Sequence, residues 1–209
     1  RQRQMCIRDR FYANIVFHGS QIFFNADKGA VTVDRYLMDT PDKGDGSLTG
    51  YNVWKWIDYD NYNYPYAGAG SPDFSTNWII LRYAEIYLND AEARLETGDV
   101  EGARKAVNMI RQRVGLPDLT ESDPEKLREL IRKERRIEYA FEEQRFYDVR
   151  RWKIGPETQT TLHGVRFVSP TEFKVTKTDI RTWNDRLYLT PVPHDEIVRS
   201  SVLKQNPGY

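Results

Sequence analysis

The chain has 209 residues, and its 31 basic and 31 acidic side chains leave a formal net charge of zero. A balanced charge provides no long-range attraction to DNA, RNA or an anionic membrane surface, so nucleic acid is not expected as a partner. No apolar run approaches the roughly 20 residues of a membrane-spanning helix. The single cysteine cannot form an internal disulfide.

The first ten residues, RQRQMCIRDR, differ in composition from everything that follows. They hold four arginines and one aspartate, a charge of +3, and Cys6 has neither an apolar segment before it nor a small-residue cleavage site. We therefore expect residues 1–10 to be a non-native scar, with a basic nucleic-acid arm as the alternative. Residues 11–209 are expected to form one domain.

Residues 11–57 are predicted to form short strands or extended segments. The stretches RFYANIVFHG, QIFFN, AVTVDRYLM and YNVWKWI are rich in β-branched and aromatic residues, and glycines and the turn-rich DTPDKGDGS separate them. The chain then changes to DYDNYNYPYAGAGSPDFSTN, residues 58–77. Its Tyr, Asn, Gly and Pro content predicts an exposed loop.

Two amphipathic segments predict a helical hairpin. Apolar residues recur at three- and four-residue steps through WIILRYAEIYLNDAEARLETG, which Thr76 or Asn77 caps and Gly98 ends. Asp99 caps the next segment, VEGARKAVNMIRQRVG, which ends before Gly115 and Pro117. Small residues on both stripes let the two helices approach closely, as in a tetratricopeptide-type hairpin; they are Ala84, Ala91, Ala103 and Ala106.

A third, long helix is predicted from Pro124 to about Val149. Asp123 precedes it as the N-cap, and its expected buried face comprises Leu127, Leu130, Ile131, Ile137 and Phe141. After Gly155 the sequence returns to Thr, Val, Phe and Tyr, which predicts two or three short strands, followed by a short helix at DEIVRS. The predicted fold class is mainly α with short strands and long loops (α+β).

The segment ERRIEYAFEEQRFYDVRRW, residues 134–152, alternates arginines with aromatic rings, a mixture that also suits nucleic-acid binding. On a helix its arginines interleave with acidic residues, so the local charge nearly cancels, whereas a phosphate-binding face would leave basic side chains unpaired. Glu134 lies on the apolar stripe, and we expect it to pair with Arg135, Arg136 or a residue of the preceding hairpin. Glu134, Arg135 and Arg136 are therefore predicted to be structural.

The strongest ligand signal in the sequence is aromatic. Trp54 and Trp56 come just before the loop at residues 58–77, and Trp183 lies in a later polar turn. Aromatic faces stack on the apolar C–H faces of sugars, and asparagine amides can hydrogen-bond to sugar hydroxyls. Packing of Trp54, Trp56 and several tyrosines against the helices is the alternative. The candidate ligand-binding residues are Tyr59, Asn61, Tyr62, Asn63, Tyr64 and Tyr66.

Motifs for catalysis and metal binding are not found in the sequence. His18, His163 and His194 have no cysteine or carboxylate at metal-ligand spacing, and the aspartates of DTPDKGDGS do not fit an EF-hand. There is no nucleophile elbow, phosphate-cradling glycine loop or dinucleotide fingerprint. We therefore expect no metal, no cofactor and no enzymatic activity.

Several segments resemble the SusD/RagB family, outer-membrane nutrient-binding lipoproteins of Bacteroidetes. They are RYAEIYLNDAEA at 82–93, the arginine-rich segment at 134–152, YLTPVPHDEI at 188–197 and the terminal QNPGY, in the same order as in the family. RFYANIVFHGS and GYNVWKWID are weaker matches. Family members are considerably longer, so residues 11–209 resemble a C-terminal domain without the N-terminal half. That half would carry the lipidated cysteine and most of the helical-repeat scaffold.

The resemblance implies non-catalytic binding of starch or another glycan at the external face of the outer membrane, as part of polysaccharide utilization. It further implies transfer of the oligosaccharide to a SusC-type TonB-dependent transporter for nutrient uptake, with membrane attachment only through a lipid anchor missing from this chain. The alternative is a protein-interaction module that uses the hairpin as a docking groove, as tetratricopeptide proteins do. Glycoside hydrolysis, which needs two opposed carboxylates, ranks below both.

Overall fold

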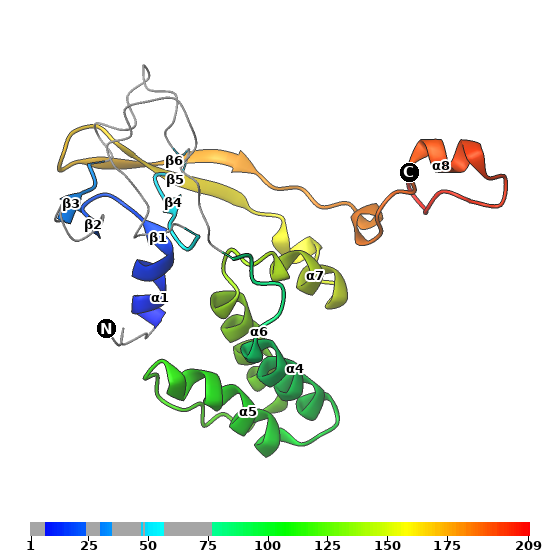
Figure 1. The fold of residues 1–209 in the computed structure, drawn as a ribbon, viewed down its shortest axis with the longest axis horizontal. Coiled ribbons are helices and arrows are strands. Elements are labelled where there is room, and N and C mark those ends of the chain that lie inside the picture. Colours follow the sequence, from blue (N-terminus) through cyan, green and yellow to red (C-terminus); the bar gives the residue numbers. More distant parts are fainter. Residues whose placement is uncertain (1–6, 24–29, 35–46, 48, 57–76) are drawn as a thin grey trace.

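The computed structural model describes residues 7–23, 30–34, 47, 49–56 and 77–209, and it combines a helical layer, a long β-hairpin and an extended C-terminal arm (Figure 1). The predicted class, mainly α with short strands, is confirmed. The helices are α1 Ile7–Asn14, α4 Tyr83–Glu96, α5 Val100–Arg113, α6 Pro124–Glu138, α7 Gln144–Arg151 and α8 His194–Arg199, with 3-10 turns η2 Pro156–Thr158 and η3 Asp185–Tyr188. The strands are β1 Ile15–Val16, β2 Gln21–Phe23, β3 Ala30–Thr32, β4 Asn52–Val53, β5 Thr161–Phe167 and β6 Phe173–Ile180.

The main hydrophobic core lies between α4, α5 and α6. Ala91 and Ala103 are fully buried, so small residues do let the two hairpin helices approach closely, as predicted. Gly98 ends α4 in a left-handed conformation, and the Asp99 side chain accepts a hydrogen bond from the Gly102 backbone N–H at 2.8 Å. The core residues are Ala84, Leu88, Ala91, Leu95, Ala103, Ala106, Val107, Ile110, Leu127, Ile131 and Tyr139.

The helix α4 begins later than the sequence pattern predicts. Residues 77–82 are not helical, and Arg82 is extended, with φ −141° and ψ 158°. The predicted cap at Thr76 or Asn77 is therefore wrong. The extended conformation places Arg82 where its guanidinium forms ion pairs with Glu138 and Glu142, and these tertiary contacts outweigh the local helical periodicity.

The predicted long third helix is interrupted. Its start is confirmed, because Pro124 is the first helical residue and the Asp123 side chain accepts from the Lys126 N–H at 2.9 Å. However, α6 ends at Glu138 and α7 begins at Gln144, and between them Phe141 and Glu143 have φ of 64° and 62°. A left-handed non-glycine residue costs about 1–2 kcal/mol. This turn leaves Phe141 exposed, so its predicted place on the buried face is also wrong.

The N-terminal segment RFYAN, predicted as a strand, belongs to α1 instead. α1 packs against α6, and the buried Arg10 pairs with Glu134 and Glu138 there at 2.8 Å each. Since α1 runs from Ile7 to Asn14, the proposed boundary at residue 10 falls inside this helix. The strand predicted here begins only at Ile15, where β1 pairs with β4.

The β5–β6 hairpin is antiparallel, with Val165 opposite Val175. The N-terminal segment joins it through a hydrogen bond from the Val165 N–H to the Thr49 carbonyl at 3.0 Å. At Gly50, which has φ 76°, a Cβ would overlap the Val165 carbonyl, so the close approach requires glycine.

The C-terminal arm carries α8 away from the helical layer (Figure 1). Its last five residues, QNPGY, fold back on the segment that precedes α8. The Gln205 amide donates to the Val192 carbonyl at 2.9 Å and accepts from the Val192 N–H at 2.8 Å. The Tyr209 hydroxyl donates to the Leu189 carbonyl at 3.1 Å. Two of the segments that resemble the SusD/RagB family, YLTPVPHDEI and QNPGY, are thus in direct contact.

Candidate functional site

Trp56 and Trp78 stack on each other at the base of the loop that the sequence marks as a ligand site. Their ring centroids are 4.5 Å apart and their planes differ by 19°. Residues 57–77 connect these two tryptophans in the sequence, so the stack joins the two residues that flank this segment. The predicted ligand-binding residues Tyr59, Asn61, Tyr62, Asn63, Tyr64 and Tyr66 all lie outside the described residues.

The stack is fixed to the helical layer through Trp56. Its indole Nε1 donates to the Phe141 carbonyl at 2.9 Å, in the left-handed turn between α6 and α7. Trp78 is 54% exposed and Phe141 40%. The site therefore presents exposed aromatic rings, and a hydrogen bond fixes Trp56 to the turn between α6 and α7.

A buried ion-pair cluster lies beside this turn. Arg82 donates to Glu142 at 2.7 Å and to Glu138 at 2.6 Å. Lys55, the neighbour of Trp56, also pairs with Glu142 and donates to the Ala140 carbonyl at 2.9 Å. Because Arg82 precedes α4, Lys55 follows β4 and Glu142 follows α6, the cluster ties three distant segments of the chain to the aromatic stack.

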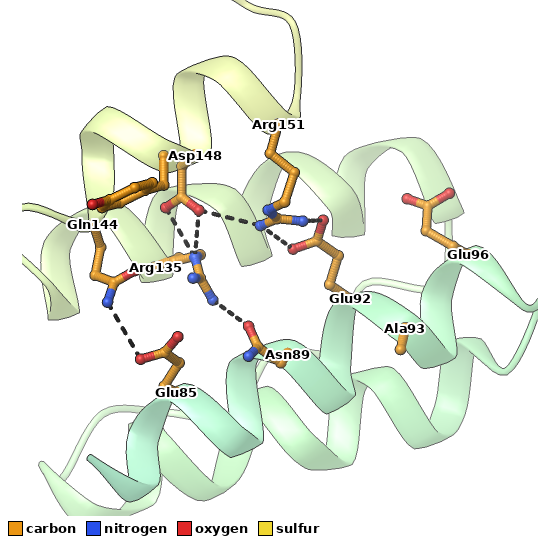
Figure 2. A pocket seen from close by; sticks show the side chains of 10 residues that line it. Glu85, Asn89, Glu92, Ala93, Glu96, Arg135, Gln144, Asp148 and Arg151 are labelled. Carbon is orange, nitrogen blue, oxygen red and sulfur yellow. Dashed lines mark hydrogen bonds and ion pairs between the residues drawn. The ribbon is translucent and has the colours of Figure 1, made fainter. Parts of the chain in front are cut away.

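A second polar cluster lines a cleft of about 640 Å³ beside α4 and α7 (Figure 2). The Arg135 Nε donates to both carboxylate oxygens of Asp148, at 2.8 and 2.9 Å, and its Nη1 donates to Asn89 at 2.7 Å. Glu92 accepts from Arg151 and, at 2.8 Å, from the Trp152 indole. The cleft thus lies over a network that joins α4, α6 and α7.

One carboxylate of each cluster, Glu138 in the first and Glu92 in the second, has a lowered pKa. Burial raises the pKa of Glu138, but attraction to Arg10 and Arg82 outweighs it and the net pKa lies below the ordinary value. Burial likewise raises the pKa of Glu92, and the hydrogen bonds from Arg151 and Trp152 more than offset this, so that pKa is also lowered. A general acid for glycoside hydrolysis needs the opposite shift. Neither glutamate has the electrostatics of a catalytic acid.

Two of the three residues predicted to be structural are buried in ion pairs. Glu134 is 3% exposed and accepts from Arg111 of α5 at 2.8 Å, a partner on the preceding hairpin. Arg135 is also 3% exposed and pairs with Asp148, whereas Arg136 is exposed. Within the 134–152 segment, Arg135 and Arg151 form ion pairs with acidic residues of the same fold.

Trp183, which was also named from the sequence, has surroundings different from those of Trp56. Trp183 packs edge-on to Tyr188, with centroids 4.8 Å apart, and a Cβ on Gly155 would overlap its indole. Trp183 is therefore a packing residue. Sequence reasoning missed the pairing of Trp56 with Trp78. The available signal was their position at the two ends of the tyrosine-rich segment.

Within the described residues no helix is long and apolar enough to cross a membrane. The same residues contain no group of three or more His, Cys, Asp or Glu side chains that could hold a metal ion. The site consists of aromatic rings and arginine-bound carboxylates.

These features define an α+β protein with a tetratricopeptide-like hairpin and an aromatic stack that is hydrogen-bonded to the turn between α6 and α7. The chain belongs to the SusD family, whose model matches residues 8–209. SusD-like protein P2 of Formosa agariphila is 38% identical over 155 residues, which are 68% of this chain and 28% of that protein. SusD-like protein P25 of the same organism is 32% identical over 172 residues, 72% of this chain and 31% of that protein. The chain thus spans less than a third of these relatives.

Solved structures agree with the family assignment. The crystal structure of a SusD-like protein from Bacteroides fragilis is 98% identical, with a TM-score of 0.88, over 96% of this chain and 39% of that chain. A SusD-like carbohydrate-binding protein from Bacteroides fragilis has a TM-score of 0.70 at 23% identity, over 90% of this chain and 40% of that chain. This second likeness shows a shared fold.

Proposed function

We propose that the protein binds an oligosaccharide without altering it chemically and delivers it to a SusC-type TonB-dependent transporter for nutrient uptake. The observation that carries the proposal is the stack of Trp56 on Trp78 at the base of the tyrosine-rich segment. Membership of the SusD family and the fold shared with a SusD-like carbohydrate-binding protein support it.

The stack suits sugar binding because it fixes one ring and exposes another. The Trp56 face is covered by Trp78 and its Nε1 is hydrogen-bonded, so Trp78 has a defined orientation while remaining 54% exposed. A rigid exposed ring offers a flat apolar surface to the C–H face of a sugar at little cost in side-chain entropy. The tyrosines and asparagines of residues 59–66 would then add further stacking and hydrogen bonds.

The ion-pair clusters support binding without catalysis. Glu138 and Glu92 have lowered pKa values and accept hydrogen bonds from arginines, which removes them as proton donors. The proposed site of action is the external face of the outer membrane. Attachment there would come through a lipid anchor in a part of the longer protein outside this chain.

The direct test is glycan-array screening of the full-length protein, followed by calorimetry with the best glycan. Trp78→Ala should weaken binding by about fivefold, since a stacked ring contributes on the order of 1 kcal/mol. Met109→Ala changes an apolar residue that is 47% exposed on α5 and serves as the control. Glycan binding that is equal in both variants would place the site elsewhere, and binding of no glycan at all would overturn the proposed function.

Transfer to the transporter needs a separate test. Detergent extraction of native outer membranes should recover the full-length protein together with a TonB-dependent transporter. Recovery of the protein without any transporter would contradict the proposed partnership, even if glycan binding were measured.

A further inference from the structure

The aromatic stack is held by side chains, because neither of its tryptophans lies within a helix or a strand. Trp56 follows β4, and Trp78 lies in residues 77–82, which precede α4 without being helical. Within the described part of the chain, the backbone N–H and carbonyl of Trp78 form no hydrogen bond. The relative position of the two rings therefore depends on neighbouring side chains that fix each segment to the helical layer.

The segment before residue 57 is fixed to the turn between α6 and α7 by two neighbouring side chains. Lys55 donates to the Ala140 carbonyl at 2.9 Å, and the Trp56 indole donates to the Phe141 carbonyl at 2.9 Å. Because both acceptors are backbone carbonyls of the same turn, the conformation of the turn determines where Trp56 lies.

Glu142 of this turn joins both segments that carry the stack. Its Oε1 pairs with Lys55, the neighbour of Trp56. Its Oε2 accepts from Arg82 Nε at 2.7 Å, and its Oε1 accepts from Arg82 Nη2 at 3.0 Å. Arg82 follows Trp78 by four residues. Among the described residues Glu142 is the one carboxylate that pairs with both cations, and its side chain is only 5% exposed, so water screens these pairs weakly.

The backbone on either side of Glu142 is in an unfavourable conformation. Phe141 and Glu143 are left-handed, with φ of 64° and 62°. Non-glycine residues keep such conformations only where the surrounding contacts fix them, and they gather at functional sites. The ion pairs of Glu142 provide contacts of this kind in the middle of the turn. The same conformation directs the Phe141 carbonyl at the Trp56 indole.

We propose that Glu142 is a positioning residue of the glycan site, which fixes the stack of Trp56 on Trp78 without itself contacting the glycan. Its ion pairs with Lys55 and Arg82 transmit the effect of the carboxylate to the two rings. The part of this inference that concerns glycan affinity rests on the proposed function. Glu142 then has a role beyond the stability of the fold, because its loss releases the aromatic stack as well.

Far-ultraviolet circular dichroism of the full-length protein tests the effect on the stack without any glycan, because two stacked indoles produce an exciton couplet. The couplet of this stack is the signal that Trp78→Ala removes. Glu142→Ala should remove most of the same signal. The control is Glu134→Ala, which removes a buried carboxylate that pairs with Arg111 of α5 and with neither Lys55 nor Arg82. This control should lower the melting temperature and keep the couplet.

Calorimetry with the best glycan of the array measures the effect on binding. Glu142→Ala should weaken binding by about fivefold, as Trp78→Ala does, whereas Glu134→Ala should leave the affinity unchanged. If Glu142→Ala does not fold, Lys55→Met is used instead. This variant keeps a long apolar side chain and leaves Glu142 paired with Arg82, and it should reduce both the couplet and the affinity.

Three results would overturn the proposal. They are a full couplet in Glu142→Ala, an equal loss of the couplet in Glu134→Ala, and a lost couplet with unchanged glycan affinity. A parent protein that binds no glycan would overturn the proposed function alone, because the couplet still decides whether Glu142 positions the stack.

Discussion

The guanidinium of Arg135 donates from Nε to both carboxylate oxygens of Asp148, and both side chains are at most 4% exposed. This contact joins α6 to α7 across the left-handed turn that separates them. Arg135 reaches α4 as well, through Asn89. The arginine-rich segment thus contains both partners of its most buried ion pair, which explains how a strongly charged sequence can be packed inside the fold.

Arg135→Ala should lower the free energy of unfolding by about 3–5 kcal/mol, because it leaves the carboxylate of Asp148 buried without its main partner. Arg94→Ala removes an exposed arginine that pairs with Asp90 and Asp99, and it should cost less than about 1 kcal/mol. Urea denaturation of the two variants measures the difference. Equal losses of unfolding free energy in the two variants would mean that the buried Arg135–Asp148 pair contributes no more to stability than an exposed pair.

Glu134→Ala should cost on the order of 3 kcal/mol, because Glu134 is 3% exposed and its loss removes a partner from Arg10 and from Arg111, whose side chain is 12% exposed. Glu101→Ala, which breaks only a surface pair with Lys105, is the matched control. Thermal melting followed by circular dichroism compares them. A Glu134→Ala variant that melts with the parent would remove the structural role assigned to this residue.

Arg10→Ala should destabilise the protein less than Glu134→Ala does. Both acidic partners of Arg10 keep other arginines, since Glu134 retains Arg111 and Glu138 retains Arg82. We expect a loss of about 1 kcal/mol, in keeping with the proposal that residues 1–10 are not native to this fold. A loss as large as that of Glu134→Ala, measured by the same melts, would argue that Arg10 is an integral part of the domain.

Glu138 couples the stability of the fold to pH. Its pKa in the folded state lies below the ordinary value of 4.5, so its contribution to stability is fully present above that pH and is lost as the pH falls through the folded-state pKa. At about pH 7 the Glu138→Gln variant should therefore have a lower free energy of unfolding than the parent. This difference in free energy should become smaller below about pH 4. Denaturation curves at both pH values measure it. A difference in free energy of unfolding that grows at low pH would mean that the pKa of Glu138 is raised in the folded state.

Replacing Tyr62, Tyr64 and Tyr66 together with alanine should weaken glycan binding by at least about tenfold, if each stacked ring contributes on the order of 1 kcal/mol. The melting temperature should stay unchanged. Calorimetry on the full-length protein gives the affinity, and differential scanning calorimetry gives the stability. Loss of stability in place of affinity would make these tyrosines packing residues.

Local chemistry made several features predictable. Asp99 and Asp123 are N-caps, Gly98 has a positive φ, and the alanines of the hairpin are buried, because capping, glycine conformation and helical periodicity depend on a few neighbouring residues. The helix starts and breaks that were predicted wrongly lie at Arg82 and at Phe141, where contacts with distant residues decide the backbone conformation. The candidate site likewise has a part that was named from the sequence and a part that only the structure shows. Trp56 was named from the sequence, whereas its stack on Trp78 was not, and the predicted tyrosines and asparagines lie outside the described residues.

By itself, the sequence determined the family, the fold class and the charge balance that argues against a polyanion-binding face, since these depend on motif order, periodicity and composition. Only the tertiary structure decided which arginine meets which carboxylate. Arg82, Arg111 and Arg135 each pair with an acid on another helix or loop, at separations along the chain that no local pattern encodes. The physical reason is that a buried charge must find an opposite charge wherever the packed helices place one, and that placement is a property of the assembled core.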